Sequence, residues 1–92
     1  MFEVGKIYLL HTKKHDFIHD PSYYLIKILE IKKDDIKYVC FVINSDSGEI
    51  FPDHNKGLPQ KSYREDIIEN FIIKQKTKKF WYKIVRQCYE SR

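Results

Sequence analysis

Hydrophobic residues in the first half of the chain are spaced as in β-strands. Residues 23–31 (YYLIKILEI) are apolar at nearly every position, which is typical of a central strand with both faces covered. Residues 36–43 (IKYVCFVI) alternate between two faces and give the clearest strand pattern in the chain. The polar run 32–35 (KKDD) between them has the composition of a turn, so the two segments are predicted to pair as a β-hairpin.

Two shorter segments extend the strand pattern on either side of this hairpin. Residues 7–10 predict a first strand, and residues 49–51 predict a short edge strand that stops at Pro52. The stretches 11–22 and 53–61 are polar and contain proline or glycine, so both are predicted to be loops. The first half of the chain therefore predicts an antiparallel sheet.

After residue 61 the spacing of apolar residues changes to that of a helix. Ser62 and Glu65 match a capping box, with Ser62 as the N-cap. The apolar stripe that follows consists of Ile67, Ile68, Phe71 and Ile72. Its spacing predicts a first helix that runs through these residues.

A second helix is predicted nearer the carboxyl end, with Thr77 as its N-cap. The same helical spacing recurs at Phe80, Trp81, Ile84, Val85, Cys88 and Tyr89. Because Phe80, Tyr82 and Ile84 also alternate, a strand is the alternative for residues 79–90. We favour the helix.

The length and composition of the chain predict a single α+β domain over residues 1–92. Thirteen Ile, seven Tyr and six Phe with no Ala favour sheet over a purely helical bundle. Residues 1–51 are predicted to be the β-rich part and residues 62–90 the helical part. The expected fold is a small antiparallel β meander, or a barrel, followed by one or two C-terminal helices.

Residues 4–8 (VGKIY) begin a series that continues with a loop, residues 23–31, a turn and residues 36–43. This order resembles small SH3-like or Tudor-like barrels, and the resemblance implies an SH3-like barrel as the form of the sheet. The run that ends in residues 42–45 (VINS) also resembles bacterial toxin ribonucleases of the MazF/PemK kind, which implies Ser45 at a catalytic Ser or Thr position. Those enzymes also keep an early Arg, and no Arg precedes Arg64 in this chain.

Positive charge is concentrated at the carboxyl end of the chain. Residues 74–92 hold seven Lys or Arg and one acid, a balance of +6, whereas residues 1–73 hold ten Lys or Arg and twelve acids, a balance of −2. A segregated basic segment indicates nucleic acid or an acidic protein surface as the partner. The candidate phosphate contacts are Lys76, Lys78, Lys79, Lys83 and Arg86, and Tyr82 is the candidate for stacking on a base.

Two observations qualify how this segment would act. Trp81 falls on the apolar stripe, so the alternative interpretation is that it anchors the helix to the sheet while the lysines keep that helix soluble. Lys outnumbers Arg in residues 74–92, and bidentate Arg contacts are the common means of sequence-specific base recognition. Binding to nucleic acid is therefore predicted to depend on the phosphate backbone.

Histidines recur at a spacing that metal sites also use. His11, His15 and His19 lie four residues apart in a predicted loop. A metal site and an accidental spacing are the two interpretations, and accidental spacing is the one we favour. We predict neither a metal ion nor a cofactor.

The remaining reactive residue types are scattered. Ser45, Asp53 and His54 are the residue types of a hydrolytic triad, but nothing in the sequence indicates that they converge. Cys40 and Cys88 are far apart and form no C-x-x-C pair, so they are predicted to be buried thiols, with a disulfide as the alternative.

These observations predict a non-enzymatic binding or regulatory module that contacts RNA or single-stranded DNA through its basic, aromatic C-terminal segment. One alternative is a protein-binding inhibitor or regulator, such as a phage-type counter-defence protein that acts on a host protein. A second is the MazF/PemK-like ribonuclease. The amino-terminal segment does not match a signal peptide and no stretch approaches about 18 apolar residues, so a cytoplasmic protein without a membrane partner is expected.

Overall fold

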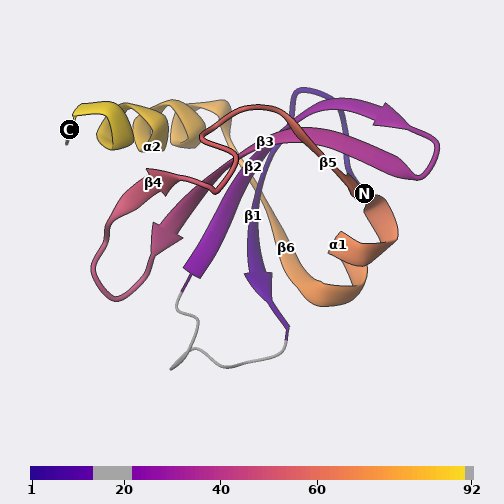
Figure 1. Ribbon diagram of the computed structural model, residues 1–92, viewed down its shortest axis with the longest axis horizontal. Helices are drawn as coiled ribbons and strands as arrows, with labels where there is room; N and C mark the ends of the chain where they lie inside the picture. The colour runs from indigo at the N-terminus through magenta and orange to yellow at the C-terminus, as the bar shows by residue number, and fades with distance from the viewer. Residues whose placement is uncertain (14–21, 91–92) are drawn as a thin grey trace.

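The computed structural model describes residues 1–13 and 22–90, which form a six-stranded antiparallel sheet and two helices (Figure 1). The strands are β1 (Ile7–Thr12), β2 (Ser22–Lys32), β3 (Asp35–Asn44), β4 (Ile50–Pro52), β5 (Gln60–Tyr63) and β6 (Phe71–Lys76). The helices are α1 (Arg64–Asn70) and α2 (Lys78–Glu90). This architecture confirms the predicted α+β class, in which an antiparallel sheet is followed by a C-terminal helix.

The strands lie in the order β4-β3-β2-β1-β6, and each pairs with its neighbours in the antiparallel direction. β3 pairs with two short strands along one edge, with β4 beside residues 41–43 and with β5 beside residues 35–38. At the other edge, β6 pairs with β1 from Phe71 to Lys76. Among the described residues no pairing joins β6 to β4 or β5, so the sheet is not closed.

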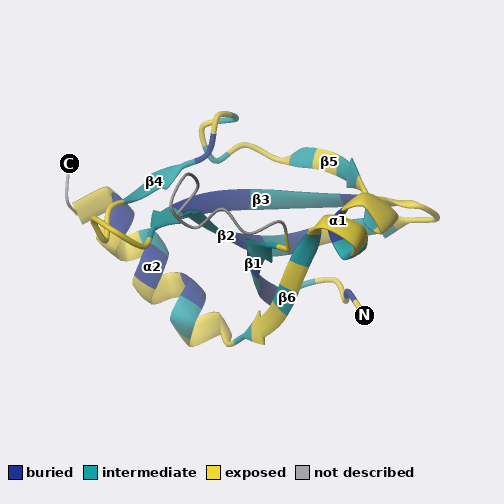
Figure 2. Cartoon of the chain, turned by 90° about the horizontal axis from the view of Figure 1, so that it is seen from below, coloured by how far each residue is buried: buried dark blue, intermediate teal, exposed yellow. Residues whose placement is uncertain are grey.

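The core is divided into two clusters, one on each face of the sheet, because successive strand residues point to opposite faces. On the helix face, α2 covers a cluster that includes Ile7, Leu25 and Phe41. On the open face, a second cluster includes Leu10 and Ile26. Figure 2 shows α2 on one side of β3, and β5 with the segment before it on the other.

The second predicted helix is confirmed as α2, and its predicted N-cap is correct. The Thr77 Oγ1 atom accepts a hydrogen bond of 3.1 Å from the Phe80 N–H group. The buried residues of α2 are Trp81, Ile84 and Cys88. Trp81 packs edge to face on Phe41, with 5.4 Å between the ring centroids. The apolar stripe therefore fixes α2 on the helix face of the sheet.

The prediction for residues 62–72 is wrong in two respects. Ser62 does not cap a helix but belongs to β5, where its hydroxyl lies 2.6 Å from the Tyr38 hydroxyl and shares a hydrogen bond with it. α1 follows Tyr63 without a side-chain cap and ends at Asn70. Phe71 then begins β6, because the backbone of this segment pairs with β1 and not with a further helical turn.

The first strand, the hairpin and the short edge strand are confirmed with slightly different bounds. The predicted loop 11–22 is wrong at its ends, since residues 11–12 extend β1 and residue 22 begins β2; residues 14–21 lie outside the described part of the chain. The predicted loop 53–61 is also shorter, because its last two residues begin β5.

The two cysteines lie in different clusters. Cys40 belongs to the open-face cluster and Cys88 to the helix-face cluster, and both are buried and form no disulfide with each other, as predicted. Neither of the two described helices, α1 and α2, is long and apolar enough to cross a membrane.

Candidate functional site

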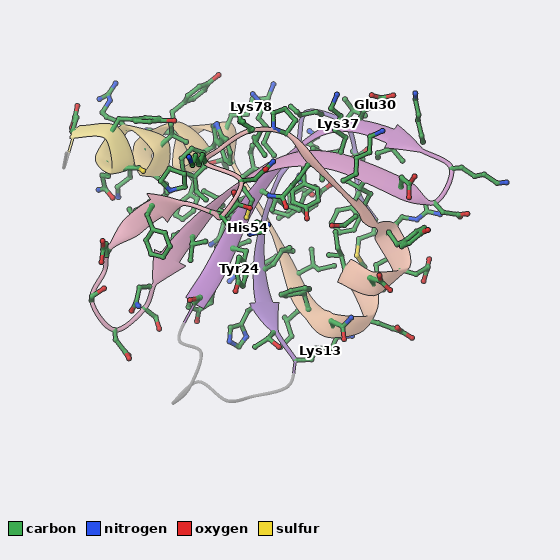
Figure 3. The ribbon with its side chains drawn as sticks, viewed as in Figure 1. Lys13, Tyr24, Glu30, Lys37, His54 and Lys78 are labelled. Carbon is green, nitrogen blue, oxygen red and sulfur yellow. The ribbon has the colours of Figure 1, made fainter. Side chains whose placement is uncertain are left out.

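The outward side of α2 presents five of the six residues selected from the sequence. At 3.6 residues per turn, Lys78, Lys79, Tyr82, Lys83 and Arg86 fall within about 140° of the helix circumference, and all five are exposed. Tyr82 is 61% exposed and lies one turn from Lys78 on one side and from Arg86 on the other. These five residues are called the cationic face below. It begins at Lys78, at the amino-terminal end of α2 (Figure 3).

Lys76, the sixth selected residue, differs from the cationic face in its surroundings. It is the last residue of β6 and is half-buried. Its Nζ atom lies 5.1 Å from the centroid of the Phe80 ring, which is a cation–π distance. Lys76 therefore adds positive charge near the start of α2, but its ammonium group is less available to a partner than those of the cationic face.

No carboxylate from residues 1–13 or 22–90 forms an ion pair with the cationic face. The ion pairs between Lys or Arg and an acid lie elsewhere, at Lys32 with Glu30 (3.2 Å) and Arg64 with Glu65 (4.0 Å). α2 also has no acid in its first turn, where Lys78 and Lys79 lie at the positive end of the helix dipole. Both features favour the binding of an anion to this side of the helix.

The two neighbouring aromatic residues of α2 have opposite environments. Trp81 is 7% exposed and packs on the sheet, as the alternative interpretation of the sequence required, whereas Tyr82 is 61% exposed. The aromatic ring that is available to a partner is therefore that of Tyr82.

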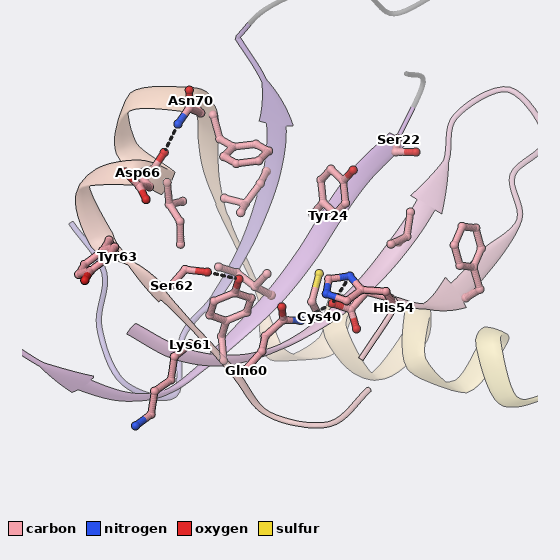
Figure 4. Close-up of a pocket in the computed structure, with 18 residues that line it drawn as sticks. Ser22, Tyr24, Cys40, His54, Gln60, Lys61, Ser62, Tyr63, Asp66 and Asn70 are labelled. Carbon is pink, nitrogen blue, oxygen red and sulfur yellow. Dashed lines mark hydrogen bonds and ion pairs between the residues drawn. The ribbon is translucent and has the colours of Figure 1, made fainter. Parts of the chain in front are cut away.

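A pocket of about 880 Å³ lies on the open face of the sheet (Figure 4). Its floor is formed by β1, β2 and β3, one wall by the segment from β4 to β5, and the other wall by α1 and the start of β6. The apolar lining is Leu10, Ile26, Val42, Phe51, Ile67 and Phe71. The polar lining includes Ser22, Tyr24, Asp53, His54, Gln60 and Asn70. A pocket of this size and mixed lining is typical of small-molecule sites.

Asp53, in the wall of this pocket, is the single buried charged residue in the described part of the chain, with 8% exposure. Its Oδ1 atom accepts a hydrogen bond of 3.1 Å from the Asn55 N–H group, and its Oδ2 atom accepts one from Gln60 Nε2. Its backbone N–H group also donates to the Cys40 carbonyl oxygen at 3.3 Å. These bonds hold the carboxylate in one place beside the floor of the pocket.

Two ionisable groups on the pocket floor, Cys40 and Tyr38, stay neutral at neutral pH. Burial, together with a smaller effect of the negative charge of Asp53, raises the pKa of the Cys40 thiol to about 12. Burial also raises the pKa of Tyr38, against the hydrogen bond with Ser62, which lowers it. Because the thiolate is the reactive form of cysteine, Cys40 is not an activated nucleophile.

The described residues do not test whether the three histidines converge. His11 lies in β1, while His15 and His19 fall outside the described residues. Residues 1–13 and 22–90 contain no group of three or more His, Cys, Asp or Glu side chains placed to hold a metal ion.

The candidate hydrolytic residues do not form a triad. His54 Nδ1 lies 3.9 Å from Asp53 Oδ2 on a side chain that is 86% exposed. Ser45 lies in the turn after β3 and is not among the residues that line the pocket. Arg64, the first Arg of the chain, lies beside Asp34 just before β3 begins, so Ser45 and Arg64 are at opposite ends of that strand.

Sequence reasoning missed the pocket and its buried carboxylate. Asp53 stands in a segment whose proline, glycine and polar residues indicated an exposed loop. One signal was present, because an Asp side chain often accepts a hydrogen bond from the backbone N–H group two residues later, an arrangement called an Asx-turn. In this chain the N–H group of Asn55 donates that bond to Asp53. That signal predicts the local turn, but it does not predict that the turn packs against β3.

Comparisons with known proteins give no relative from which a role could be transferred. No protein family matches the chain, no curated protein matches it, and no solved structure matches it. The resemblance to SH3-like barrels and to MazF/PemK-like ribonucleases therefore remains a prediction from sequence, and the function has to be argued from the site itself.

Proposed function

We propose that this protein is a cytoplasmic, non-enzymatic binding module that holds single-stranded RNA or DNA on the cationic face of α2. The observation behind the proposal is the placement of four cations and an exposed Tyr on one side of a helix, with no carboxylate of the described chain paired to them. The rest of the sequence up to residue 73 has a balance of −2, so the charge of the protein is polarised toward this helix.

The cationic face has the dimensions of a short stretch of nucleic-acid backbone. From Lys78 to Arg86 it extends about 12 Å along the helix axis at a rise of about 1.5 Å per residue. Each Lys or Arg that neutralises a phosphate releases condensed counterions, which makes the affinity fall with salt. Stacking of one base on Tyr82 would add about 1–3 kcal/mol.

The composition of the face indicates little sequence preference. Three of its four cations are Lys, which acts as a point charge, and one is Arg, whose planar group forms bidentate contacts with guanine. Phosphate contacts position a nucleic acid without reading its bases. The proposed binding is therefore led by the backbone, with Tyr82 selecting for unpaired bases over a duplex.

The proposal is tested by fluorescence anisotropy of a labelled uridine 12-mer and a thymidine 12-mer across a salt series that starts at about 50 mM, where electrostatic affinity is largest. Four phosphate contacts to a single strand predict a slope of log affinity against log salt of about −3. The quadruple variant K78Q/K79Q/K83Q/R86Q is expected to show a slope of log affinity against log salt near zero. A lack of binding by the native protein at low salt would contradict the proposal.

A matched control removes the same amount of charge from other exposed positions. The control K6Q/K32Q/K33Q/K61Q lowers the net charge equally but leaves α2 intact, and all four of its lysines are exposed. It is expected to keep most of the native slope. Equal losses in the two variants would mean that net charge, and not the cationic face, determines the affinity.

An acidic protein surface is the second candidate partner for the same face. Tyr82 and Tyr89 are 61% and 57% exposed on α2, and exposed aromatic residues are frequent anchors in protein interfaces. A pull-down from a nuclease-treated lysate of the producing cell or its host separates the two candidates. A partner protein that persists after nuclease and is lost with K78Q/K79Q/K83Q/R86Q favours the regulator; loss of all partners on nuclease treatment favours nucleic acid.

A further inference from the structure

We propose that the pocket on the open face binds a small organic cation with a flat apolar body, such as an aromatic amidine or amine, whose charged end is held by Asp53. This site is independent of the cationic face, which lies on the other side of the sheet.

The buried carboxylate of Asp53 is the first argument for a cationic ligand. Burial of a charge without a charged partner is unfavourable, and buried acids in proteins are normally paired with a cation or a metal. The side chain of Asp53 is 6% exposed, and its two hydrogen bonds come from neutral amide groups of Asn55 and Gln60. Its contact with His54 is 3.9 Å long and involves a largely exposed imidazole. A cationic ligand in the pocket would supply the positive charge that the Asp53 carboxylate lacks as a partner.

The apolar part of the pocket is the second argument, because it defines the body of the ligand. The Tyr24 and Phe71 rings meet edge to face with 5.9 Å between their centroids, and both line the pocket. Leu10, Ile26 and Val42 add aliphatic surface to the floor of the pocket. A flat apolar group fits against such aromatic and aliphatic surfaces, with gains from burial and from ring contacts.

The charge around the pocket is the third argument, because it excludes an anionic ligand. The lining contains two carboxylates, Asp53 and Asp66, and one Lys, Lys61. Lys61 is exposed, and its ammonium group points away from the pocket in Figure 4. The field of Asp53 also reaches the floor, where its negative charge contributes to the raised pKa of Cys40. Phosphate is therefore expected to bind the cationic face and not the pocket.

The test is a titration of the full chain, labelled with ¹⁵N, with benzamidine and with its neutral isostere benzamide, followed by amide chemical shifts. Benzamidine is expected to shift the amide signals of pocket residues, Cys40, Asp53 and Gln60 among them. It is expected to bind about tenfold more tightly than benzamide, since its positive charge pairs with the Asp53 carboxylate in addition to the hydrogen bonds that both ligands can donate. Equal affinities, no shifts, or benzamidine shifts confined to α2 would each overturn the proposal. This comparison needs no mutation.

A variant assigns the difference to one carboxylate. D53N keeps the shape of the side chain and removes its charge, so it is expected to lower benzamidine affinity about tenfold and to lower benzamide affinity much less. The matched control is E49Q, which removes an exposed carboxylate from outside the pocket and is expected to bind benzamidine as the native protein does. Native benzamidine affinity in a D53N protein that retains dispersed amide signals would contradict the role of Asp53.

Discussion

Strand residues alternate between the two faces of the sheet, but the two faces are covered differently. The helix face is closed by α2, which inserts Trp81, Ile84 and Cys88 and turns its cations outward. The open face is filled at one end by the cluster around Ile28 and Ile36, while its other end is left as a pocket beside Asp53. The difference shows that this small domain buries apolar side chains on both faces of its sheet but keeps a concave, mildly acidic surface on only one of them.

The largest expected effect comes from α2, where adjacent aromatic residues belong to different environments. W81A should lower the free energy of unfolding by about 3–5 kcal/mol, because it empties a buried aromatic site against Phe41. Y82A should change it by no more than about 0.5 kcal/mol, because its side chain is exposed. Urea unfolding followed by circular dichroism measures both changes. Tryptophan fluorescence is unsuitable because W81A removes the only Trp of the chain. Similar losses in the two variants would contradict the assigned orientation of α2.

The next effect is a pH dependence that comes from the open face. The pKa of Cys40 rises from its ordinary value of 9.0 to about 12 on folding, so the folded protein holds this proton more tightly than the unfolded chain. Its contribution to stability is present below pH 9 and is lost as the pH rises toward 12, by up to about 1.4 kcal/mol per pH unit. The difference in unfolding free energy between native protein and C40A should therefore shrink across this window. A constant difference would contradict the burial of the thiol.

A smaller effect is expected from the hydrogen bond that joins β3 to β5 at the pocket. Y38F removes the hydroxyl that lies 2.6 Å from Ser62 Oγ and should cost about 0.5–1.5 kcal/mol of unfolding free energy. Y63F is the control, because Tyr63 is 63% exposed and is expected to tolerate loss of its hydroxyl. Thermal unfolding of the two variants measures the difference, and equal midpoints would indicate that the bond contributes nothing.

The sequence predicted those parts of the fold that depend on neighbours in the chain. The hairpin of β2 and β3 followed from a nearly continuous apolar run before a polar turn and an alternating segment after it. Helix α2 followed from a stripe of apolar residues after Thr77. The same reasoning selected the cationic face, because charge and helical spacing are both local properties. The structure then placed all five of its residues on one exposed side.

The parts that the sequence did not predict depend on contacts between distant segments. Ile67, Ile68, Phe71 and Ile72 fit a helical stripe, and only the unpaired edge of β1 explains why the last two belong to a strand. Ser62 matched a capping pattern, yet the β3 edge beside it offered strand pairing. The pocket could not be predicted for the same reason, because it needs β2, β3, α1 and the segment around Asp53 to converge.

The most direct test of the proposed role is an amide chemical-shift titration of the native protein with a thymidine 12-mer at about 50 mM salt, where electrostatic contacts are strongest. The account predicts shifts in residues 78–86 of α2 that diminish with added salt, while the amide signals of Asp53 and Gln60 in the pocket stay in place. Shifts centred on the pocket, or an unchanged spectrum throughout the titration, would contradict the assignment of nucleic-acid binding to α2.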